Sequence, residues 1–316
     1  MRSIILILLS LPLLFSCADQ EGFTDPSGPQ EVVPAGTSEV TFSSGPLPQR
    51  VYIFRKEGNA FRYASTLDGG WSDEGKMTTR LLIGDYKFLF TGPLNGQVNV
   101  LPAPLDKTVT FEQLRFVSQA APGQPGNILP AEELFLPEPE IADSVYSIRG
   151  GDKIECTLKR RVSQLGFALN RGYKEGDEYV PQPYAEGHNI LETIGEIRVE
   201  ISGVGRECNY LDTSGEGTIS CSYAAAERDS IDSRGFAAFT GPFVFPPAGD
   251  KDVHLAITLI PVSGEAYPTL QLTSKLEANR KLLVNLWLSS SYFDIGVTIR
   301  NLPISGRTEG DSGVWE

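Results

Sequence analysis

Short stretches in which apolar and polar residues alternate recur along most of the chain. Alternation with a period of two, rich in Val, Ile, Phe and Tyr, is typical of half-buried β-strands. Because these stretches are separated by loops rather than by long helices, the pattern predicts an all-β chain built of sandwiches, with one short helix at 185–194. The clearest predicted strands lie at 38–43, 51–54, 80–83, 86–90, 197–201, 253–259, 282–288 and 295–299.

The parity of the alternation changes once within a short distance. The apolar residues are even-numbered in 154–158 and odd-numbered in 165–169. A strand that keeps one face buried cannot change parity without an extra residue, so we expect a bulge or a break near 160–163. The turn residues Gly150-Gly151-Asp152 favour a domain junction near 150, which gives an N-terminal sandwich at 37–150 and a C-terminal sandwich at 151–316.

The beginning of the chain has the pattern of an export signal. Arg2 precedes an uncharged run, Ile4 to Phe15, that is too short for a spanning helix, which needs about 20 apolar residues. We therefore expect a signal peptide at 1–16. The residues Leu14-Phe15-Ser16-Cys17 resemble the bacterial lipobox, which implies that Cys17 carries a lipid; the alternative is an ordinary signal peptide with an incidental cysteine. Residues 17–36, rich in Pro, Gly and acids, then form a lipidated flexible tether.

Composition narrows the classes of function. The 316-residue chain has a formal net charge of −13, 32 Gly and 22 Pro. An acidic surface repels phosphate backbones, so nucleic acid is not an expected partner. The two His residues have no second His or Cys at metal-binding spacing, and no G-x-S-x-G elbow is present. We therefore expect no metal site and no cofactor.

Three cysteines follow Cys17. Cys156 shares a face with Ile154 and Leu158 and is interpreted as a small buried hydrophobe. A hairpin that turns at 214–215 would place Cys208 opposite Cys221 and allow a disulfide, because an exported protein reaches an oxidising compartment. Two separate free thiols are the alternative interpretation.

Four segments, in their order along the chain and together with the lipobox, carry a resemblance to a known family. The chain resembles the Bacteroidales fimbrillin-like lipoproteins, and most closely the FimB-type fimbrial anchor or minor subunits. The resemblance implies two transthyretin-like β-sandwich domains in tandem, lipidation at the outer membrane, a place in an adhesive fimbria, and no enzymatic activity. The segments are Val51-Tyr-Ile-Phe-Arg55, Leu82-Ile-Gly-Asp-Tyr-Lys-Phe88, Leu158-Lys-Arg-Arg-Val-Ser-Gln-Leu165 and Ile197-Arg-Val-Glu-Ile-Ser-Gly-Val204.

Two hypotheses of function follow. In the first, the chain is a structural fimbrial subunit that joins partner subunits by β-strand addition, as an outer-membrane anchor or accessory subunit rather than a shaft or tip subunit. In the second, it is a surface lipoprotein that binds glycans through aromatic side chains in loops. A host or bacterial surface ligand fits either hypothesis. The candidate aromatic residues are Trp71, Tyr173, Tyr179 and Tyr184.

Arg50 is a candidate protease site. Between Cys17 and Arg50 there are five acids and no Lys or Arg, so a trypsin-like protease finds its first cut after Arg50. In the family that the chain resembles, shaft subunits mature by an arginine-specific cut near this place, which removes the first strand and opens a groove. Here the strand at 38–43 corresponds to that first strand, and the resemblance to anchor subunits favours its retention. The alternative is that Arg50 is an ordinary loop residue.

Overall fold

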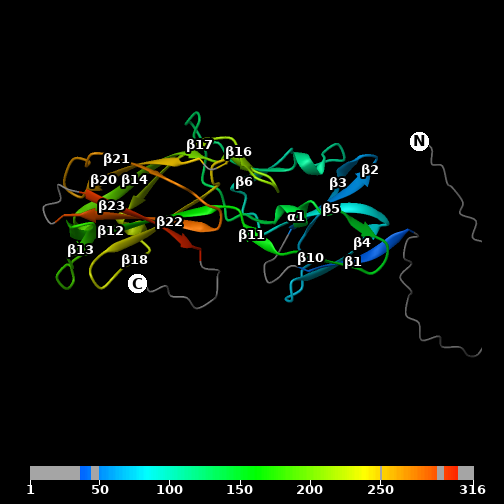
Figure 1. Cartoon of the computed structure of the whole chain (residues 1–316), viewed down its shortest axis with the longest axis horizontal. Helices are drawn as coiled ribbons and strands as arrows, with labels where there is room; N and C mark the ends of the chain where they lie inside the picture. The colour runs from blue at the N-terminus through cyan, green and yellow to red at the C-terminus, as the bar shows by residue number, and fades with distance from the viewer. Residues whose placement is uncertain (1–35, 44–49, 250, 290–294, 305–316) are drawn as a thin grey trace, which may run out of the picture. The chain divides into compact units, whose positions relative to one another are not determined.

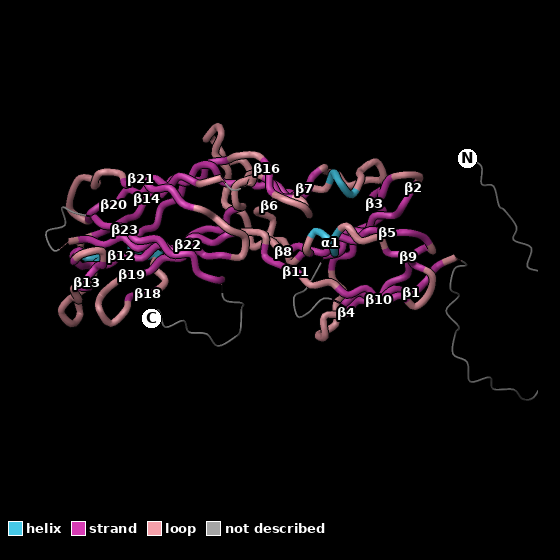
Figure 2. Tube along the Cα trace, in the orientation of Figure 1, coloured by secondary structure: helices cyan, strands magenta, loops and turns pink. Residues whose placement is uncertain are grey.

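The computed structural model describes residues 36–43, 50–249, 251–289 and 295–304. Strands dominate these residues, and the helical elements are single turns (Figure 2): α1 (Pro139–Ala142), η1 (Phe111–Gln113), η2 (Ile190–Glu192) and η3 (Ala225–Glu227). The all-β prediction is confirmed. In the part of the chain that the structure describes, no helix has the length and apolar character needed to cross a bilayer.

The helix expected at 185–194 is wrong. Only the 3-10 turn η2 forms there, and the Asn189 side chain caps it by accepting a 3.0 Å hydrogen bond from the backbone N–H of Leu191. The next strand already begins at Ile194. Ile190 and Ile194 are both buried in a hydrophobic core.

Three sheets make up the N-terminal part. Their strands are β1 (Thr37–Ser43), β2 (Arg50–Glu57), β3 (Ala60–Asp68), β4 (Lys76–Leu82), β5 (Gly84–Thr91), β6 (Val98–Leu101), β7 (Arg115–Ser118), β9 (Tyr146–Ile148), β10 (Asp152–Glu155), β15 (Glu207–Cys208) and β16 (Thr213–Ser214). The sheets have the orders β10-β1-β4, β3-β2-β5-β9 and β16-β15-β7-β6. A separate pair joins β8 (Phe135–Pro137) to β11 (Leu158–Arg160).

The sheet that contains β2 and β5 is buried on both faces. Val51 and Ile53 of β2 pack into a cluster that we call the first-strand core, together with Val40 and Phe42 of β1. The side chains that alternate with them pack into a second cluster, the middle core, whose members include Tyr52, Phe54, Leu89, Phe111 and Phe116. One strand therefore fills two cores with its odd and even residues, which explains why 51–54 and 86–90 are almost continuously apolar.

Two sheets form the C-terminal part. Their strands are β12 (Ser163–Glu175), β13 (Glu178–Pro181), β14 (Ile194–Val204), β17 (Gly217–Ala224), β18 (Ser230–Ile231), β19 (Ala237–Val244), β20 (Val253–Pro261), β21 (Leu270–Ser274), β22 (Arg280–Leu288) and β23 (Ile295–Pro303). One sheet has the order β18-β19-β12-β22-β23, with β13 beside β12, and the other has the order β17-β14-β20-β21 (Figure 1). Their inward side chains make the C-terminal core, which includes Phe167, Val199, Leu255 and Val284.

The junction between the two parts lies later than the sequence predicts. β10 pairs with β1, and β11 pairs with β8, so residues 152–160 belong to the N-terminal sheets. The predicted break near 160–163 is confirmed, because β11 ends at Arg160 and β12 begins at Ser163. Val162 packs in the middle core and Leu165 in the C-terminal core. The change of parity therefore marks the point where the chain passes from the N-terminal part to the C-terminal part, whereas the turn near 150 does not.

Candidate strand-exchange site around the first strand

β1 is the central strand of its sheet. It pairs antiparallel with β4 over its whole length, from Thr37 opposite Leu82 to Ser43 opposite Lys76. On its other edge it pairs parallel with β10, from Val40 opposite Asp152 onward. The partners come from far along the chain, so β1 occupies a slot between two strands that do not pair with each other in this sheet.

The side chains of β1 are deeply buried on one face. Val40 and Phe42 are both 0 % exposed. The Phe42 ring meets the edges of two rings of β5, with centroid distances of 5.0 Å to Phe88 and 5.7 Å to Phe90. Burial of one such side chain contributes about 1.5–3 kcal/mol. Glu39, which precedes Val40, faces solvent, so the strand carries the alternation that its sequence predicts.

Both ends of β1 are held by backbone hydrogen bonds. The carbonyl of Gly36 accepts a 2.8 Å hydrogen bond from the N–H of Ile83, which follows β4. The carbonyl of Ser43 accepts a 2.9 Å hydrogen bond from the N–H of Cys156, which follows β10. The strand is therefore fixed along its length and at its ends by the two strands that flank it.

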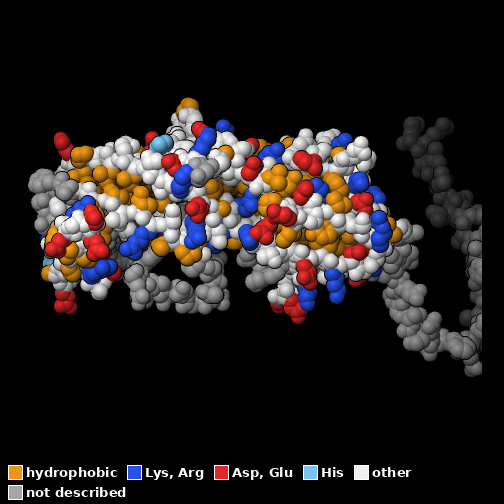
Figure 3. All heavy atoms as spheres, viewed as in Figure 1, with side chains coloured by type: hydrophobic (Ala, Val, Ile, Leu, Met, Phe, Trp, Pro, Cys, Tyr) orange, Lys and Arg blue, Asp and Glu red, His pale blue; other side chains and the backbone are white. Residues whose placement is uncertain are grey.

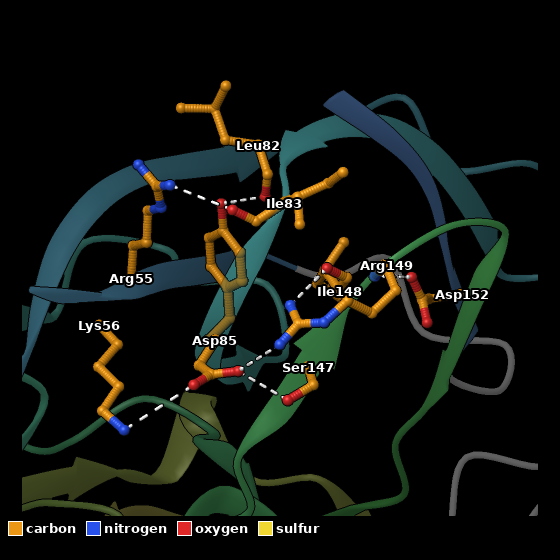
Figure 4. A network of polar contacts seen from close by, with 10 residues as sticks. Arg55, Lys56, Leu82, Ile83, Asp85, Ser147, Ile148, Arg149 and Asp152 are labelled. Atoms are coloured by element: carbon orange, nitrogen blue, oxygen red, sulfur yellow. Dashed lines mark hydrogen bonds and ion pairs between the residues drawn. The ribbon is translucent and has the colours of Figure 1, made fainter. Parts of the chain in front are cut away.

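A polar network fixes the turn that leads into β10 (Figure 4). The Asp85 carboxylate accepts a 2.6 Å hydrogen bond from the Ser147 hydroxyl and lies 3.4 Å from the Arg149 guanidinium and 3.8 Å from Lys56. The hydrogen bond from Ser147, with these cations, holds the pKa of Asp85 below its usual value. Asp152 closes the turn, because its carboxylate accepts from the backbone N–H of Arg149 at 2.8 Å.

The same region ties down the end of β4. Arg55 donates a 3.1 Å hydrogen bond to the carbonyl of Ile83, and the Tyr86 hydroxyl donates a 2.7 Å hydrogen bond to the carbonyl of Leu82 (Figure 4). The residues of this network belong to β2, β4, β5, β9 and β10 and to the turns beside them. Both walls of the slot are therefore held in place by contacts that do not involve β1.

Arg50 is the first residue of β2. Its backbone pairs with Asp68 on one side and Thr91 on the other, and its guanidinium forms an ion pair with the Asp68 carboxylate. The residue on the far side of the candidate cut, Val51, is 0 % exposed. The interpretation of Arg50 as a loop residue is therefore wrong, and the bond after it lies inside a paired, buried strand.

We expect trypsin to cut slowly after Arg50 in the folded protein. A protease needs several residues in an extended, unpaired state, and 51–53 reach that state only when β2 opens. Limited digestion followed by N-terminal mass spectrometry measures the rate at which chains starting at Val51 appear. The Asp68→Asn variant removes a surface ion pair worth at most about 1 kcal/mol and is expected to speed the cut by no more than about fivefold. Rapid accumulation of that N-terminus from folded wild-type protein would contradict the expectation.

The cysteines do not lie as the predicted hairpin requires. The hairpin turns at 209–212, because Cys208 pairs with Thr213, and the Asn209 side chain accepts from the backbone N–H of Leu211 and Asp212. Cys208 is buried in the middle core, whereas Cys221 lies in β17 opposite Val199 and packs against the C-terminal core. Both are free cysteines, so the predicted register and the disulfide built on it are corrected. Cys17, the expected lipid site, lies outside the described residues.

Of the candidate aromatic residues, Tyr179 lines a cavity. Tyr179 stacks on Trp287 above the outer face of the sheet that contains β12 and β22. Tyr173 is exposed, Trp71 packs against the first-strand core, and the Tyr184 ring lies 4.8 Å from the Arg171 guanidinium. Sequence reasoning missed Trp287. Its odd number was a usable signal, because the even-numbered residues of 282–288 form the predicted buried face. Trp287 therefore lies on the outer face with Lys281, Leu283 and Asn285.

Comparison with known proteins found similarity at the level of structure only. No family model matches the chain, and no curated protein matches its sequence. A candidate polysaccharide-binding protein from Bacteroides thetaiotaomicron matches with a TM-score of 0.54 at 11 % identity, over 85 % of this chain and 98 % of that one. A candidate adhesin from Bacteroides ovatus matches with a TM-score of 0.51 at 11 % identity, over 86 % and 96 %.

The third match is the fimbrial anchor protein Mfa2 from Porphyromonas gingivalis. It has a TM-score of 0.50 at 12 % identity, over 85 % of this chain and 98 % of that one. None of the three is described by an enzymatic activity. The matched regions cover nearly the whole of each of these proteins, so the similarity concerns a complete architecture rather than one sheet. The chain has the fold of Bacteroidales adhesin-like and fimbrial anchor proteins.

Proposed function

We propose that this chain is a structural, non-enzymatic subunit of a fimbria-like surface assembly, held at the outer membrane by lipid on Cys17, and that it retains its own first strand. The observation that carries the proposal is the position of β1, which fills the slot between β4 and β10 with Val40 and Phe42 fully buried. A subunit whose slot is filled by its own strand cannot accept a partner's strand there. That property suits an anchor or accessory position better than a position in a polymerising shaft.

The fold supports the same proposal. Mfa2 is described as a fimbrial anchor protein, and its fold is shared over most of both chains. In this proposal the N-terminal and C-terminal parts correspond to the two tandem transthyretin-like sandwiches that the sequence resemblance implies. Partner subunits join by β-strand addition, in which an extended segment pairs with a sheet edge and side-chain pockets set the specificity.

The N-terminus of protein extracted from the outer membrane tests the retention of β1. Mass spectrometry is expected to find an acylated Cys17 followed by an intact sequence through Arg50 and Val51. Fimbrial subunits identified in the same cross-linked preparation would support the assembly role. A mature N-terminus at Val51 would overturn the anchor position, because the lipid and β1 would both have been removed.

The Cys17→Ala variant tests the lipid anchor. Each buried methylene of an acyl chain contributes about 0.8 kcal/mol to membrane binding, and two or three chains together hold a protein firmly. Without the thiol no diacylglycerol can be attached, and the acidic chain has no electrostatic attraction to an anionic bilayer. We expect the variant to move from the membrane pellet to the soluble fraction at low salt. A Ser16→Ala variant, which keeps the thiol, serves as the control and is expected to remain in the pellet.

A further inference from the structure

The outer face of the sheet that contains β12 and β22 carries a cavity of about 380 Å³. This volume lies in the lower part of the range for sites that bind small molecules. The lining includes side chains that alternate along the strands with those of the C-terminal core. On β22, Leu282, Val284 and Leu286 face the core, whereas Leu283, Asn285 and Trp287 line the cavity.

The floor of the cavity is a row of small and polar residues that crosses the strands. Strand register places Ala168 beside Ala238 on one side and beside Asn285 on the other. The row continues to Ser230 on β18 and to Thr298 on β23. Because the central side chains are short, the floor lies lower than the rows on either side of it, which makes a trough across the sheet.

One wall of the trough is aromatic. The Trp287 and Tyr179 rings are stacked, with centroids 5.2 Å apart and planes 9° apart, and the Phe236 ring meets Trp287 edge-on at 6.3 Å. Glycines make this wall possible. A Cβ atom at Gly296 would lie 1.8 Å from the Tyr179 hydroxyl, and one at Gly172 would lie 3.0 Å from the Trp287 ring.

The opposite side of the trough is basic. Lys281 lies flat over Gly166, where a Cβ atom would come within 2.4 Å of its chain, and Arg300 follows on β23. Burial lowers the pKa of Lys281, and the charge of Asp229 opposes this effect. Arg234 also lines the cavity and is paired with Asp232 at 2.7 Å. The lining therefore holds three cations and one anion, in a chain of net charge −13 whose surface mixes both signs (Figure 3).

Polar groups on the floor and the aromatic wall are only weakly engaged. The Asn170 side chain is 7 % exposed, and its amide donates a 3.5 Å hydrogen bond to the carbonyl of Ala168. The Trp287 indole N–H donates a 3.5 Å hydrogen bond to the Thr298 hydroxyl. Both distances are well above the usual 2.9–3.0 Å, so a ligand oxygen that approached more closely would compete with these partners.

We propose that this trough binds a saccharide through a carboxylated pyranose ring. The apolar face of the ring would pack against the Trp287–Tyr179 wall, as amphipathic rings do on aromatic side chains. The hydroxyl groups would hydrogen-bond with the amides of Asn170 and Asn285, and the carboxylate would face Arg300 and Lys281. Charge-assisted contacts with the planar Arg300 guanidinium and the Lys281 ammonium select a carboxylate over a neutral group. The inference does not depend on a fimbrial role.

Saturation-transfer NMR with matched sugars tests the proposal on the soluble chain from Ala18 to Glu316. The probes are the methyl glycosides of glucuronate, galacturonate and N-acetylneuraminate, with methyl glucoside as the neutral counterpart of the first. At least one carboxylated sugar is expected to bind about tenfold more tightly than methyl glucoside. Binding of none of them, or binding of all three carboxylated sugars no tighter than that of methyl glucoside, would overturn the proposal, as would binding of an acidic peptide alone.

Variants locate the site. Arg300→Gln changes an exposed side chain and is expected to remove most of the preference for the carboxylated sugar while leaving weak binding of the ring. Trp287→Leu is expected to abolish binding of both sugars, with thermal unfolding measured to show that the variant is folded. Arg198→Gln, an exposed arginine on the other sheet, is the matched control and is expected to bind as the wild type does. Unchanged binding in Arg300→Gln and Trp287→Leu would refute this location.

Discussion

The Phe42→Ala variant is expected to lower the free energy of unfolding by about 3–5 kcal/mol, the range for a large aromatic side chain removed from a packed core. Phe42 is 0 % exposed and touches the rings of Phe88 and Phe90, so alanine leaves a cavity between β1 and β5. Because Phe42 packs β1 against the sheet beneath it, the loss is also expected to weaken the pairing of the strand itself. Urea denaturation followed by circular dichroism measures the change.

Cys156 reports on β1 directly. Its backbone N–H is bonded to Ser43, and burial raises the pKa of its thiol to about 12. At pH 8 the group is therefore almost entirely the unreactive thiol, and modification by a maleimide requires opening of the site. In Phe42→Ala, Cys156 is expected to react at least tenfold faster than in the wild type, as located by peptide mass spectrometry. Cys208 serves as an internal reference, because it lies in the middle core rather than beside β1.

Glu39→Ala provides the matched control. Glu39 lies on the same strand and faces solvent, so its replacement is expected to change the free energy of unfolding by less than about 0.5 kcal/mol and to leave Cys156 protected. If Phe42→Ala and Glu39→Ala behaved alike, β1 would not be the buried element on which the proposed function rests.

Arg160→Met is expected to cost about 3 kcal/mol of stability. The Arg160 side chain is 8 % exposed, donates a 2.8 Å hydrogen bond from Nε to Glu133, and donates a second of 2.8 Å to the Asn279 side chain. Removing one partner of a buried pair leaves the other charge uncompensated, which typically costs 3–5 kcal/mol. The lower figure applies because Glu133 is 34 % exposed and keeps some hydration.

Lys159, the residue before Arg160, provides a matched comparison with an exposed ion pair. Lys159 forms an ion pair with Glu138, but the two side chains are 58 % and 45 % exposed, so Lys159→Met is expected to cost no more than about 1 kcal/mol. Equilibrium urea denaturation of both variants, and of the double variant Arg160→Met with Glu133→Gln, measures the difference. A double variant more stable than Arg160→Met alone would confirm the pairing, because Glu133→Gln leaves no uncompensated charge, and equal costs for Arg160→Met and Lys159→Met would refute the buried role of Arg160.

The contacts of Arg160 also join the two parts of the chain. It lies at the end of β11, whereas Asn279 lies just before β22. Asn279 has a φ of +60°, a conformation that asparagine tolerates, and its backbone N–H donates a 3.0 Å hydrogen bond to Val162. Loss of Arg160 is therefore expected to make unfolding of the two parts less cooperative as well as easier.

The alternation of apolar and polar residues predicted the strands well, because burial of one face of a strand requires apolar side chains at every second position. The segments 38–43, 197–201, 253–259, 282–288 and 295–299 all lie in strands. The pairing of these strands could not be predicted in the same way. Val40 lies opposite Asp152, and Glu207 lies opposite Val117, so the partners are set by packing between residues far apart in sequence. For the same reason β10, which was expected to open the second domain, belongs to the first.

One error had a visible signal. The disulfide prediction assumed a turn at 214–215, whereas Asn209 begins the turn and its side chain satisfies two backbone N–H groups. Asparagine favours turns because its side chain can hydrogen-bond the backbone two residues on, so Asn209 was a usable signal for a turn at this point. For Arg50 the sequence offers no such signal. Its neighbours do not show whether it precedes a strand or is the first residue of that strand.

The double pairing of β1 has a mechanical consequence. A pull applied at Gly36 along the strand axis acts in shear, because the hydrogen bonds to β4 and β10 lie across the direction of the load and share it. A strand paired on one edge and pulled sideways would instead lose its bonds one after another. Resistance to force is governed by the rate of unfolding rather than by the equilibrium stability. A chain tethered through residues before β1 would therefore carry its load through the strand that is best placed to resist it.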